Sequence, residues 1–325
     1  MEIEIRRVDW PFAQEFRIAS RSQSVAETVE VRISEGGLTG RGEAMGVYYH
    51  GETADSIYET LRSFRAEVGR GVTREHLQTL LPPGGARNAV DCALWDLEAK
   101  RSGRRAWEVA GLSKVEPLVS AYTLSLDSPR NMREAAAAVP AYPILKLKLG
   151  GEGDPERVAE VRAARPDATI TVDANQAWNE RQLREFVPKL ADLGVVLIEQ
   201  PLPADADEPL ASFKSAVPLC ADESCQTRAS LPRLRGKYRF INIKLDKTGG
   251  LTEALALARD AQAEGFELMV GCMAGSSLGM APAFIVGQLC RVVDLDGPLL
   301  AAADVAHPIR YEGSRMFPPD LSLWG

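Results

Sequence analysis

The sequence predicts an α/β protein in which a (β/α)8-type barrel is joined to an N-terminal α+β domain. Three observations support this prediction. Apolar runs alternate with helical segments from about residue 117, antiparallel strand patterns precede them, and charged residues stand near the ends of five of the runs. Counted from Lys148, these charges follow at steps of 25, 26, 23 and 22 residues. Such steps fit one strand, one helix and two loops, which is the repeating unit of a barrel.

The first 48 residues are predicted to form antiparallel strands. Apolar and polar residues alternate in EIEIRRVDW and in ETVEVRISEGGLTGRGEA, and the second segment contains a Gly-Gly turn at 36–37. Residues 17–24 lie between the two segments, are rich in Ser and Arg, and are predicted to form a loop. Residues 52–110 show the i, i+3, i+4 spacing of helices. Strands followed by helices indicate a separate α+β domain.

Eight strands separated by helices are predicted in the rest of the chain. The segments are VSAYTLSL, ILKLKLG, TITVDAN, VVLIEQP, PLCADES, FINIKLDK, ELMVGCM and VVDLDGP. A doubly wound sheet would need a phosphate loop such as GxGxxG after its first strand, and the sequence has none there. The segment KTGG at 247–250 could hold a phosphate through backbone N–H groups, but it follows the sixth strand. We therefore expect a capping domain over 1–112, a barrel over 113–303, and a C-terminal segment, 304–325, that returns to the capping domain.

Composition argues against several classes of function. The 325 residues carry a formal net charge of −7 and no basic stripe, which argues against nucleic-acid binding. No apolar stretch reaches the 18 residues of a membrane span, and the charged N-terminus is unlike a signal peptide. The five cysteines form no CxxC pair, so we expect reduced thiols in a cytoplasmic protein. Cys220 and Cys272 fall in strand patterns and are predicted to fill the core.

Three acidic residues are predicted to bind a divalent metal ion. Asp173, Glu199 and Asp222 stand at the ends of three neighbouring strands, where barrels place their active sites. Three carboxylates without His or Cys nearby select Mg²⁺, or Mn²⁺, over Zn²⁺. Each acid alone could be only the N-cap of the next helix. Three of them at barrel spacing favour a metal site.

Three lysines flank the acids. Lys146 and Lys148 alternate on one strand and therefore point to the same face, while Lys244 ends a strand four further on around the barrel. Ammonium groups on opposite sides of a metal suggest two bases that face opposite sides of one carbon. Their pKa values are expected to fall toward about 7–8 through each other and the metal. A Schiff-base aldolase also uses a barrel lysine, but it has no need of three clustered acids.

In these motifs the sequence resembles the enolase superfamily, in its muconate-lactonizing subgroup. The motifs KLK, VDAN, EQP, ADES and IKLDKTGG occur in the family's order and spacing over essentially the whole chain. The resemblance implies a modified TIM barrel, Mg²⁺ bound by the three acids, and acid/base roles for Lys148 and Lys244. It also implies that Lys146 helps to neutralise the enediolate formed when an α-proton leaves. Asn175 and Glu223 are either supports of the metal site or helix caps.

Within the subgroup, the resemblance is closest to dipeptide epimerases of the L-Ala-D/L-Glu type. Asp294 and Asp296 match the pair that binds a substrate α-ammonium group in that family, although Asp296 could instead begin an ordinary turn with Asp294 solvated. Arg21 falls where some relatives pair an arginine with the side-chain carboxylate of a terminal Glu. Thr123 matches a hydroxyl position near the peptide. The implied activity is Mg²⁺-dependent epimerisation of a small-molecule dipeptide at the α-carbon of its C-terminal residue, by a homo-oligomer.

Other reactions of this fold use some of the same groups. An N-acylamino acid racemase acting on N-acetylglutamate has no free ammonium, so Asp294 and Asp296 would lack a partner. The o-succinylbenzoate synthase reaction fits the acidic pair equally poorly. Acid-sugar dehydratases need a His–Asp dyad, and none of the three histidines falls in a barrel strand. A degenerate barrel acting as a scaffold would lose buried charged residues because they cost stability. Here the three acids and the three lysines are all present.

Overall fold

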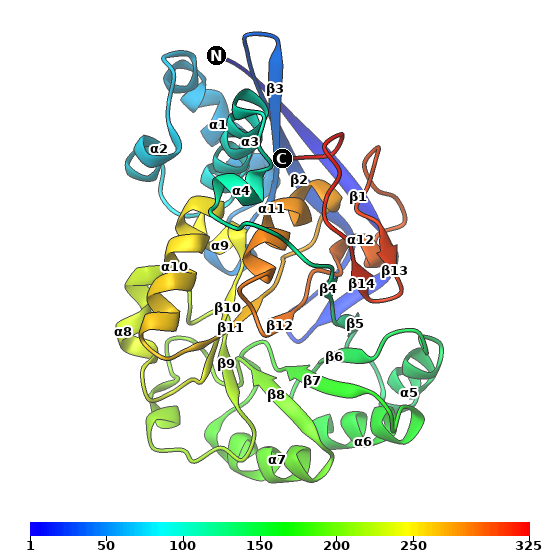
Figure 1. Ribbon diagram of the computed structural model, residues 1–325. Helices are drawn as coiled ribbons and strands as arrows, with labels where there is room; N and C mark the ends of the chain where they lie inside the picture. Colours follow the sequence, from blue (N-terminus) through cyan, green and yellow to red (C-terminus); the bar gives the residue numbers. More distant parts are fainter.

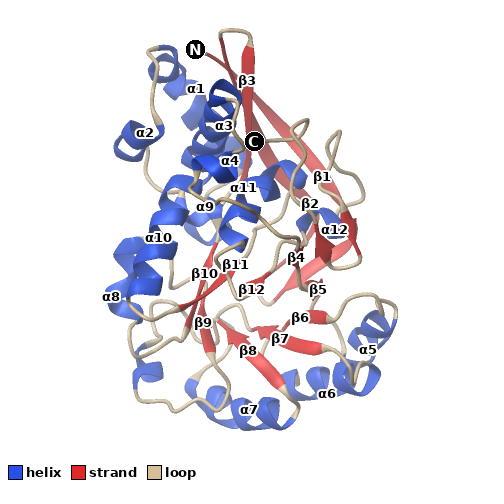
Figure 2. Cartoon of the chain, in the orientation of Figure 1, coloured by secondary structure: helices blue, strands red, loops and turns tan.

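The computed structural model describes residues 1–325, and its strands form three sheets. A three-stranded antiparallel sheet lies at the N-terminus, an eight-stranded parallel sheet forms the barrel, and a short antiparallel sheet contains a hairpin near the C-terminus (Figure 1). Figure 2 shows helices along the outside of the large sheet and beside the N-terminal one. The predicted fold, a barrel with an α+β capping domain, is therefore confirmed.

The N-terminal sheet consists of β1 (Glu2–Ile18), β2 (Arg21–Glu35) and β3 (Leu38–Met45). The predicted Gly-Gly turn joins β2 to β3, and its two glycines have φ angles of 59° and 81°. The predicted loop over 17–24 is wrong, because Arg17 pairs with Ser22 and the two strands continue into a long ribbon with a two-residue turn. Arg17 also forms ion pairs with Glu15 and Asp127. These carboxylates neutralise the arginine charge that favoured the loop prediction.

Helices of the capping domain pack against this sheet. They are α1 (Ala54–Gly69), α2 (Arg74–Leu80), α3 (Gly85–Ser102) and α4 (Ala106–Val109), and the first three occupy predicted positions. Thr53 begins α1 with a capping box, and Thr73 caps α2 through the backbone N–H of His76. Helix α3 approaches β3 so closely that a Cβ at Gly40 would lie 2.1 Å from the carbonyl oxygen of Ala93. Glycine is therefore required at that position of the strand.

The eight barrel strands lie side by side in chain order. They are β5 (Tyr122–Leu124), β6 (Ile144–Lys148), β7 (Thr169–Asp173), β8 (Val195–Glu199), β9 (Leu219–Ala221), β10 (Phe240–Ile243), β11 (Glu267–Val270) and β12 (Val292–Val293). The backbone N–H of Ala121 donates to the carbonyl oxygen of Val293 at 2.8 Å, which joins the first strand region to the last. All eight predicted strands are confirmed, each shorter than its apolar segment.

Helices and short helical turns connect the barrel strands. They are α5 (Pro129–Ala137), α6 (Asp154–Ala164), α7 (Glu180–Asp192), α8 (Leu231–Leu234), α9 (Leu245–Thr248), α10 (Leu251–Ala263), α11 (Ser277–Gly287), α12 (Gly297–Leu300) and the 3-10 turns η2 (Glu208–Ala211) and η3 (Arg228–Ser230). All except α12 lie between the strands, where the sequence predicts helices. Apolar side chains from the strands and from these helices form one continuous core.

The end of the chain contacts both parts of the fold. Its hairpin, β13 (Tyr311–Glu312) and β14 (Arg315–Met316), pairs antiparallel with β4 (Leu118–Val119). The indole of Trp324 is buried and donates to the backbone oxygen of Arg41 at 2.9 Å, while the N–H of Gly325 donates to Asp96 at 2.7 Å. Figure 1 accordingly shows the C-terminus beside α3 and β3.

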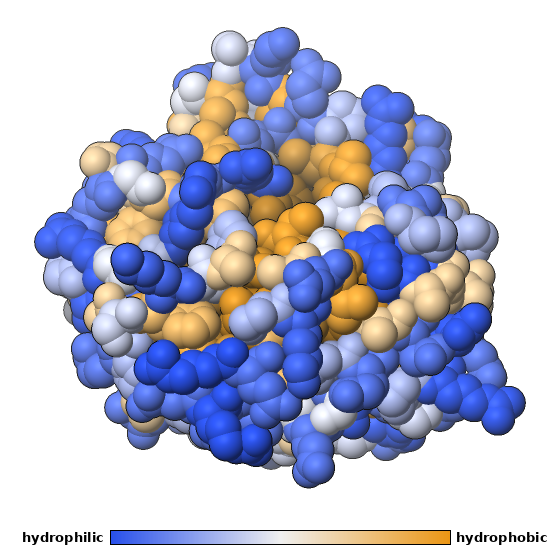
Figure 3. Space-filling view, turned by 90° about the horizontal axis from the view of Figure 1, so that it is seen from below, coloured by the Kyte–Doolittle hydropathy of each residue, from blue (hydrophilic) through white to orange (hydrophobic).

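The surface and the helix lengths bear on membrane association. None of the helices combines the length and the hydropathy that crossing a membrane requires. In the face shown in Figure 3, hydrophilic residues cover the periphery and hydrophobic residues gather near the middle. The large apolar side chains that are well exposed come from separate parts of the sequence: Leu38, Leu80, Val119, Val196 and Leu321.

Candidate active site

A cavity lies between the capping domain and the carboxyl ends of the barrel strands. The barrel lines it with polar groups, chiefly Thr123, Lys148, Asn175, Asp222, Lys244, Asp294 and Asp296. The capping domain lines it with apolar and aromatic groups and one arginine, chiefly Phe12, Phe16, Ile18, Arg21, Met45, Tyr48 and Tyr49. The site is therefore formed jointly by both domains.

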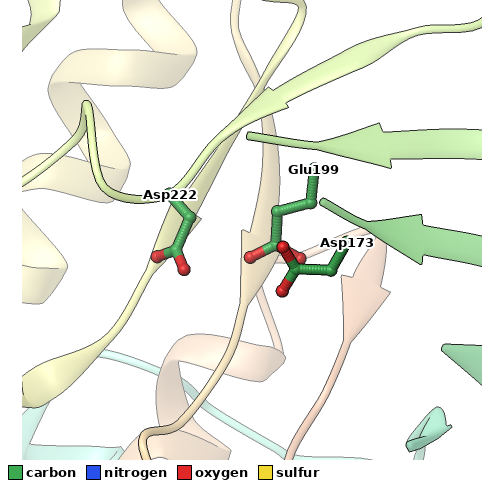
Figure 4. Close-up of side chains that lie close together, drawn as sticks. All are labelled: Asp173, Glu199 and Asp222. Atoms are coloured by element: carbon green, nitrogen blue, oxygen red, sulfur yellow. The ribbon is translucent and has the colours of Figure 1, made fainter. Parts of the chain in front are cut away.

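The three predicted metal-binding acids converge at one side of this cavity. Asp173 ends β7, Glu199 ends β8, and Asp222 directly follows β9, so neighbouring strands bring their side chains together (Figure 4). One carboxylate oxygen from each lies within 4.8 Å of the others, and all three residues are at most 1% exposed. Buried carboxylates this close repel one another, and an all-oxygen donor set suits a hard cation such as Mg²⁺. The residues therefore fit a divalent metal ion.

Strained backbone orients two of these acids. Beyond β7, Asn175 has a φ of 43°, and its N–H donates to Asp173 at 2.9 Å. Beyond β8, Gln200 has a φ of 34°, and its side-chain oxygen accepts from the backbone N–H of Asp222 at 2.9 Å. Left-handed backbone at residues other than glycine costs about 1–3 kcal/mol, and such strain clusters at functional sites. Gln200 lies within the EQP motif, but its supporting role was not predicted.

Lys146 lies among the carboxylates. Its Nζ is 2.7 Å from Glu199, 2.7 Å from Asp294 and 3.3 Å from Asp173. Lys148, two residues along β6, forms a 2.7 Å ion pair with Asp173. Both lysines of β6 therefore contact the metal-binding acids. Lys146 also pairs with Asp294, which directly follows β12, the last barrel strand.

Lysines from the other side of the barrel hold Asp222. The Nζ of Lys244 is 2.6 Å from one carboxylate oxygen of Asp222, and the Nζ of Lys247 is 2.6 Å from the other. Lys247 is 2% exposed and also donates to the backbone oxygens of Asp222 and Asn242. It was not predicted, although it lies inside the IKLDKTGG motif. Asp222 is therefore fixed by two ammonium groups at once.

The carboxylates determine the protonation of this cluster. Burial alone would lower the pKa of Lys244, but Asp222 and Glu199 raise it well above its usual value. The pKa of Lys146 is also raised above its usual value despite burial, by Asp294, Glu199 and Asp173. The expected fall of the lysine pKa values beside a bound metal ion stays a prediction. Burial raises the pKa of Glu199 to about 7, whereas Lys244 and Lys247 overcome the effect of burial and hold the pKa of Asp222 below its usual value.

The acidic pair beyond β12 faces the same cavity. Asp294 is 5% exposed and Asp296 is 3% exposed, so the alternative of a solvated Asp294 is wrong. Asp296 begins α12 and accepts a 2.6 Å hydrogen bond from the backbone N–H of Thr123. The hydroxyl of Thr123 lies 3.5 Å from Asp294. Burial, together with the charge of Asp294, raises the pKa of Asp296 to about 7.

Arg21 reaches the cavity from the tip of the β1–β2 ribbon. Its guanidinium lies 4.6 Å from the centre of the Tyr48 ring, which holds it over the aromatic face. Tyr48 and Tyr49 belong to the 3-10 turn η1 (Tyr48–His50), and no periodicity in the sequence indicated their role. Cys272 is partly buried, and it packs against the core while also lining the cavity, whereas Cys220 is fully buried in β9.

Two relatives resemble the chain over most of its length. The L-Ala-D/L-Glu epimerase of Escherichia coli (strain K12) is 43% identical over 304 residues, which are 93% of this chain and 95% of the relative. The N-acetyl-D-glutamate racemase of a Pseudoalteromonas species is 48% identical over 256 residues, which are 79% of this chain and 81% of the relative. Both relatives are named for compounds of glutamate.

Solved structures and family models agree with these relatives. An enolase family member from Agrobacterium tumefaciens with homology to dipeptide epimerases, with bound sodium and L-Ala-L-Glu, has a TM-score of 0.98 at 44% identity and matches 100% of this chain and 99% of its own. A dipeptide epimerase from Cytophaga hutchinsonii, complexed with Mg and D-Ala-L-Val, has a TM-score of 0.91 at 26% identity over 98% and 93%. The model of the mandelate racemase/muconate lactonizing enzyme N-terminal domain matches residues 1–111, and the enolase C-terminal domain-like model matches residues 130–321. The chain therefore belongs to the mandelate racemase/muconate lactonizing enzyme family of the enolase superfamily.

Proposed function

We propose that this chain is an isomerase that epimerises a dipeptide of the L-Ala-D/L-Glu type, with Mg²⁺, at the α-carbon of the C-terminal residue. One observation carries the proposal. Lys148 ends β6, Lys244 follows β10 four strands further round the barrel, and both line one cavity beside three clustered carboxylates. The 43% identity with an L-Ala-D/L-Glu epimerase supports the same reaction.

Asp173, Glu199 and Asp222 would hold the Mg²⁺. When bound, the ion supplies positive charge that stabilises the substrate carboxylate as electron density moves onto it. Lys146 adds a fixed positive charge next to the same acids, 2.7 Å from Glu199. Its ammonium also offsets the repulsion among the carboxylates, so it acts electrostatically rather than as a base.

The two cavity lysines would transfer the proton. Lys148 reaches one face of the α-carbon and Lys244 the other, so one removes the α-proton and the other delivers a proton to the opposite face. Delivery from the opposite face inverts the configuration. Return from the same lysine, after its ammonium has exchanged with solvent, retains the configuration and introduces a solvent proton. The two lysines exchange roles for the reverse reaction.

Charged groups around the cavity would select the substrate. Asp294 is already paired with Lys146, so Asp296 is the better placed of the two acids to accept the α-ammonium group of a dipeptide. The backbone N–H of Thr123 fixes Asp296 for this role. Arg21 would pair with the side-chain carboxylate of a C-terminal glutamate from the ribbon above. An unpaired charge in a closed site costs about 2–5 kcal/mol, so these pairings discriminate strongly between substrates.

N-acetylglutamate racemisation is the second candidate. It is favoured by the 48% identity with an N-acetyl-D-glutamate racemase. The same lysines and metal would serve, but an acetylated nitrogen carries no charge and would leave Asp296 facing a neutral amide. No comparison or contact favours the o-succinylbenzoate synthase reaction.

We also propose where the domains begin and end. We place the capping domain at 1–112, the barrel at 113–303, and the C-terminal segment at 304–325, where Trp324 and Gly325 contact β3 and α3. The five free cysteines support the expected cytoplasmic location. Assembly as a homo-oligomer remains a prediction from the family resemblance.

Proton exchange in ²H₂O tests the function directly. The enzyme with Mg²⁺ is incubated with L-Ala-L-Glu and, separately, with N-acetyl-L-glutamate, and the α-proton signal and the new epimer are followed by ¹H NMR. We expect L-Ala-D-Glu carrying deuterium at the α-carbon, and a higher kcat/KM for the dipeptide. Asp296→Asn is the matched variant, because it removes the charge and keeps the acceptor of the Thr123 N–H. A wild-type preference for N-acetylglutamate over every free dipeptide tested would establish the second candidate instead.

A further inference from the structure

The short helix α9 carries much of the chemistry on the far side of the barrel. Lys244 stands at its N-terminus, and Lys247, inside it, holds Asp222. The helix has only four residues, so it cannot hold its own position through a long hydrogen-bonded ladder. Whatever fixes α9 therefore also determines where the Lys244 ammonium lies.

Helix α3 of the capping domain forms hydrogen bonds with α9 at two points. The side-chain amide of Asn88 donates to Asp246, in the middle of α9, at 2.9 Å. The neighbouring Arg87 donates to the backbone oxygens of Thr248 and Gly249, at the end of α9, at 2.6 and 3.1 Å. Asn88 is 3% exposed and Arg87 is 5% exposed, so solvent does not compete for these bonds. Two consecutive residues of α3 thus hold the middle and the end of α9.

The two glycines after α9 permit this close approach. A Cβ at Gly249, whose φ is 71°, would lie 2.5 Å from Nε of Arg87, and a Cβ at Gly250 would lie 2.5 Å from Asp91 of the same helix. The N–H of Gly250 is already bonded to the backbone oxygen of Leu245. The KTGG segment is therefore built for contact with α3, and the reading of it as a phosphate loop is wrong.

We propose that Asn88 is a positioning residue for Lys244, acting through Asp246. It touches no reacting group, but its hydrogen bond fixes the turn that begins at Lys244, while Lys148 stands on β6 and receives no such support. The inference rests on the proposed role of Lys244 as one of two bases. Its consequence is asymmetric, because loss of the Asn88 amide disturbs proton transfer on one face of the α-carbon and spares the other.

Single-diastereomer exchange in ²H₂O separates the two faces. Lys148→Ala and Lys244→Ala first identify which diastereomer, L-Ala-L-Glu or L-Ala-D-Glu, depends on which lysine. Asn88→Leu removes the amide while keeping a side chain of similar size. We expect it to slow exchange of the Lys244-dependent diastereomer about tenfold, since small displacements of a reacting group cost rates of this order or more, and to change the other less than about twofold. The smaller Asn88→Ser is measured in parallel, so the result does not depend on accommodating leucine.

Thr252→Val is the matched control. It also removes one hydrogen bond between α3 and the barrel, the partly buried one from Trp95 to Thr252 at 2.9 Å, but this bond does not involve α9. Its ratio of the two exchange rates should equal that of the wild type. Equal slowing of both diastereomers by Asn88→Leu and Asn88→Ser would overturn the proposal, because a general loss of structure affects both faces.

Amide hydrogen exchange, followed by mass spectrometry, gives a readout without substrate. In Asn88→Leu the amides of residues 244–250 should exchange faster than in the wild type and in Thr252→Val, while those of β6 stay unchanged. Unchanged protection of 244–250 would refute the positioning role. If the wild type exchanges neither diastereomer, the proposed function fails, and the amide measurement alone still decides whether Asn88 holds α9.

Discussion

Asp246 should make the folded protein less stable as the pH rises. Its carboxyl is buried between the domains and accepts from the N–H of Met45 at 3.0 Å and from Asn88 at 2.9 Å. Burial raises its pKa to about 7, against these hydrogen bonds, and the nearby carboxyl groups of Glu52 and Glu43 raise it further. The folded protein therefore keeps a proton on this group that an unfolded chain releases near pH 3.8.

The sign and the size of the effect follow from this difference. Below about pH 4 the group is protonated in both states, and above about pH 7 it is ionised in both. Between these values the unfolded chain binds fewer protons than the folded one, so the free energy of unfolding falls as the pH rises. The difference between a pKa of about 7 and one of 3.8 corresponds to about 4 kcal/mol. Asp246→Asn keeps a neutral acceptor at every pH and should not show this loss.

Urea unfolding at a series of pH values measures the effect. Wild type, Asp246→Asn and the exposed control Asp205→Asn are unfolded in EDTA between pH 4.5 and 8.5. The stability of Asp246→Asn relative to the wild type should increase by about 3–4 kcal/mol over this range, whereas the control should track the wild type within about 0.5 kcal/mol. A difference that is flat with pH, or that shrinks as the pH rises, would show that Asp246 is ionised in the folded protein.

Further predictions concern the catalytic centre. Asp173→Asn should abolish Mg²⁺-dependent turnover while unfolding cooperatively, and full activity of demonstrably metal-free wild type would contradict the metal role. Lys148→Ala and Lys244→Ala should both stop epimerisation, each retaining α-proton exchange of one diastereomer by NMR; normal epimerisation by either variant would end the two-base mechanism. Asp296→Asn should lower kcat/KM for the dipeptide at least about tenfold, and N-acetylation of the substrate should harm the wild type far more than this variant. Lys247→Met should cost about 3 kcal/mol in urea unfolding because Asp222 loses a buried ammonium partner, and an unchanged midpoint would refute this.

Much of the barrel was predictable because its signal is local. An apolar run of five residues with a charge at its end indicates a strand that reaches an active site, and the regular steps from Lys148 to Lys244 repeat that signal five times. The acids of the metal centre follow from the same pattern, because neighbouring parallel strands place their ends side by side. Helix α11 gives no such local signal. It is buried on all sides, so it has no polar face to give a helical period.

The remaining features depend on partners distant in the sequence. The Ser- and Arg-rich stretch 17–24 pairs with itself as a ribbon, and its Arg17 contacts Asp127, 110 residues away. Lys146 and Asp294 are 148 residues apart, and no periodicity relates them. Sequence patterns therefore indicated that each of these residues is charged and near the site, but not which of them neutralise one another.

This choice of partner changes how the acidic pair should act. Asp294 and Asp296 look equivalent in the sequence, two residues apart after one strand. In the structure, Asp294 forms an ion pair with Lys146. Asp296 instead accepts a hydrogen bond from the neutral backbone N–H of Thr123. A cationic substrate group therefore gains more from Asp296, and removal of Asp294 would instead leave Lys146 with fewer counter-charges beside the metal centre. The two substitutions should consequently differ in kind: Asp296→Asn should raise KM for a dipeptide, whereas Asp294→Asn should lower kcat for every substrate that the two lysines can reach.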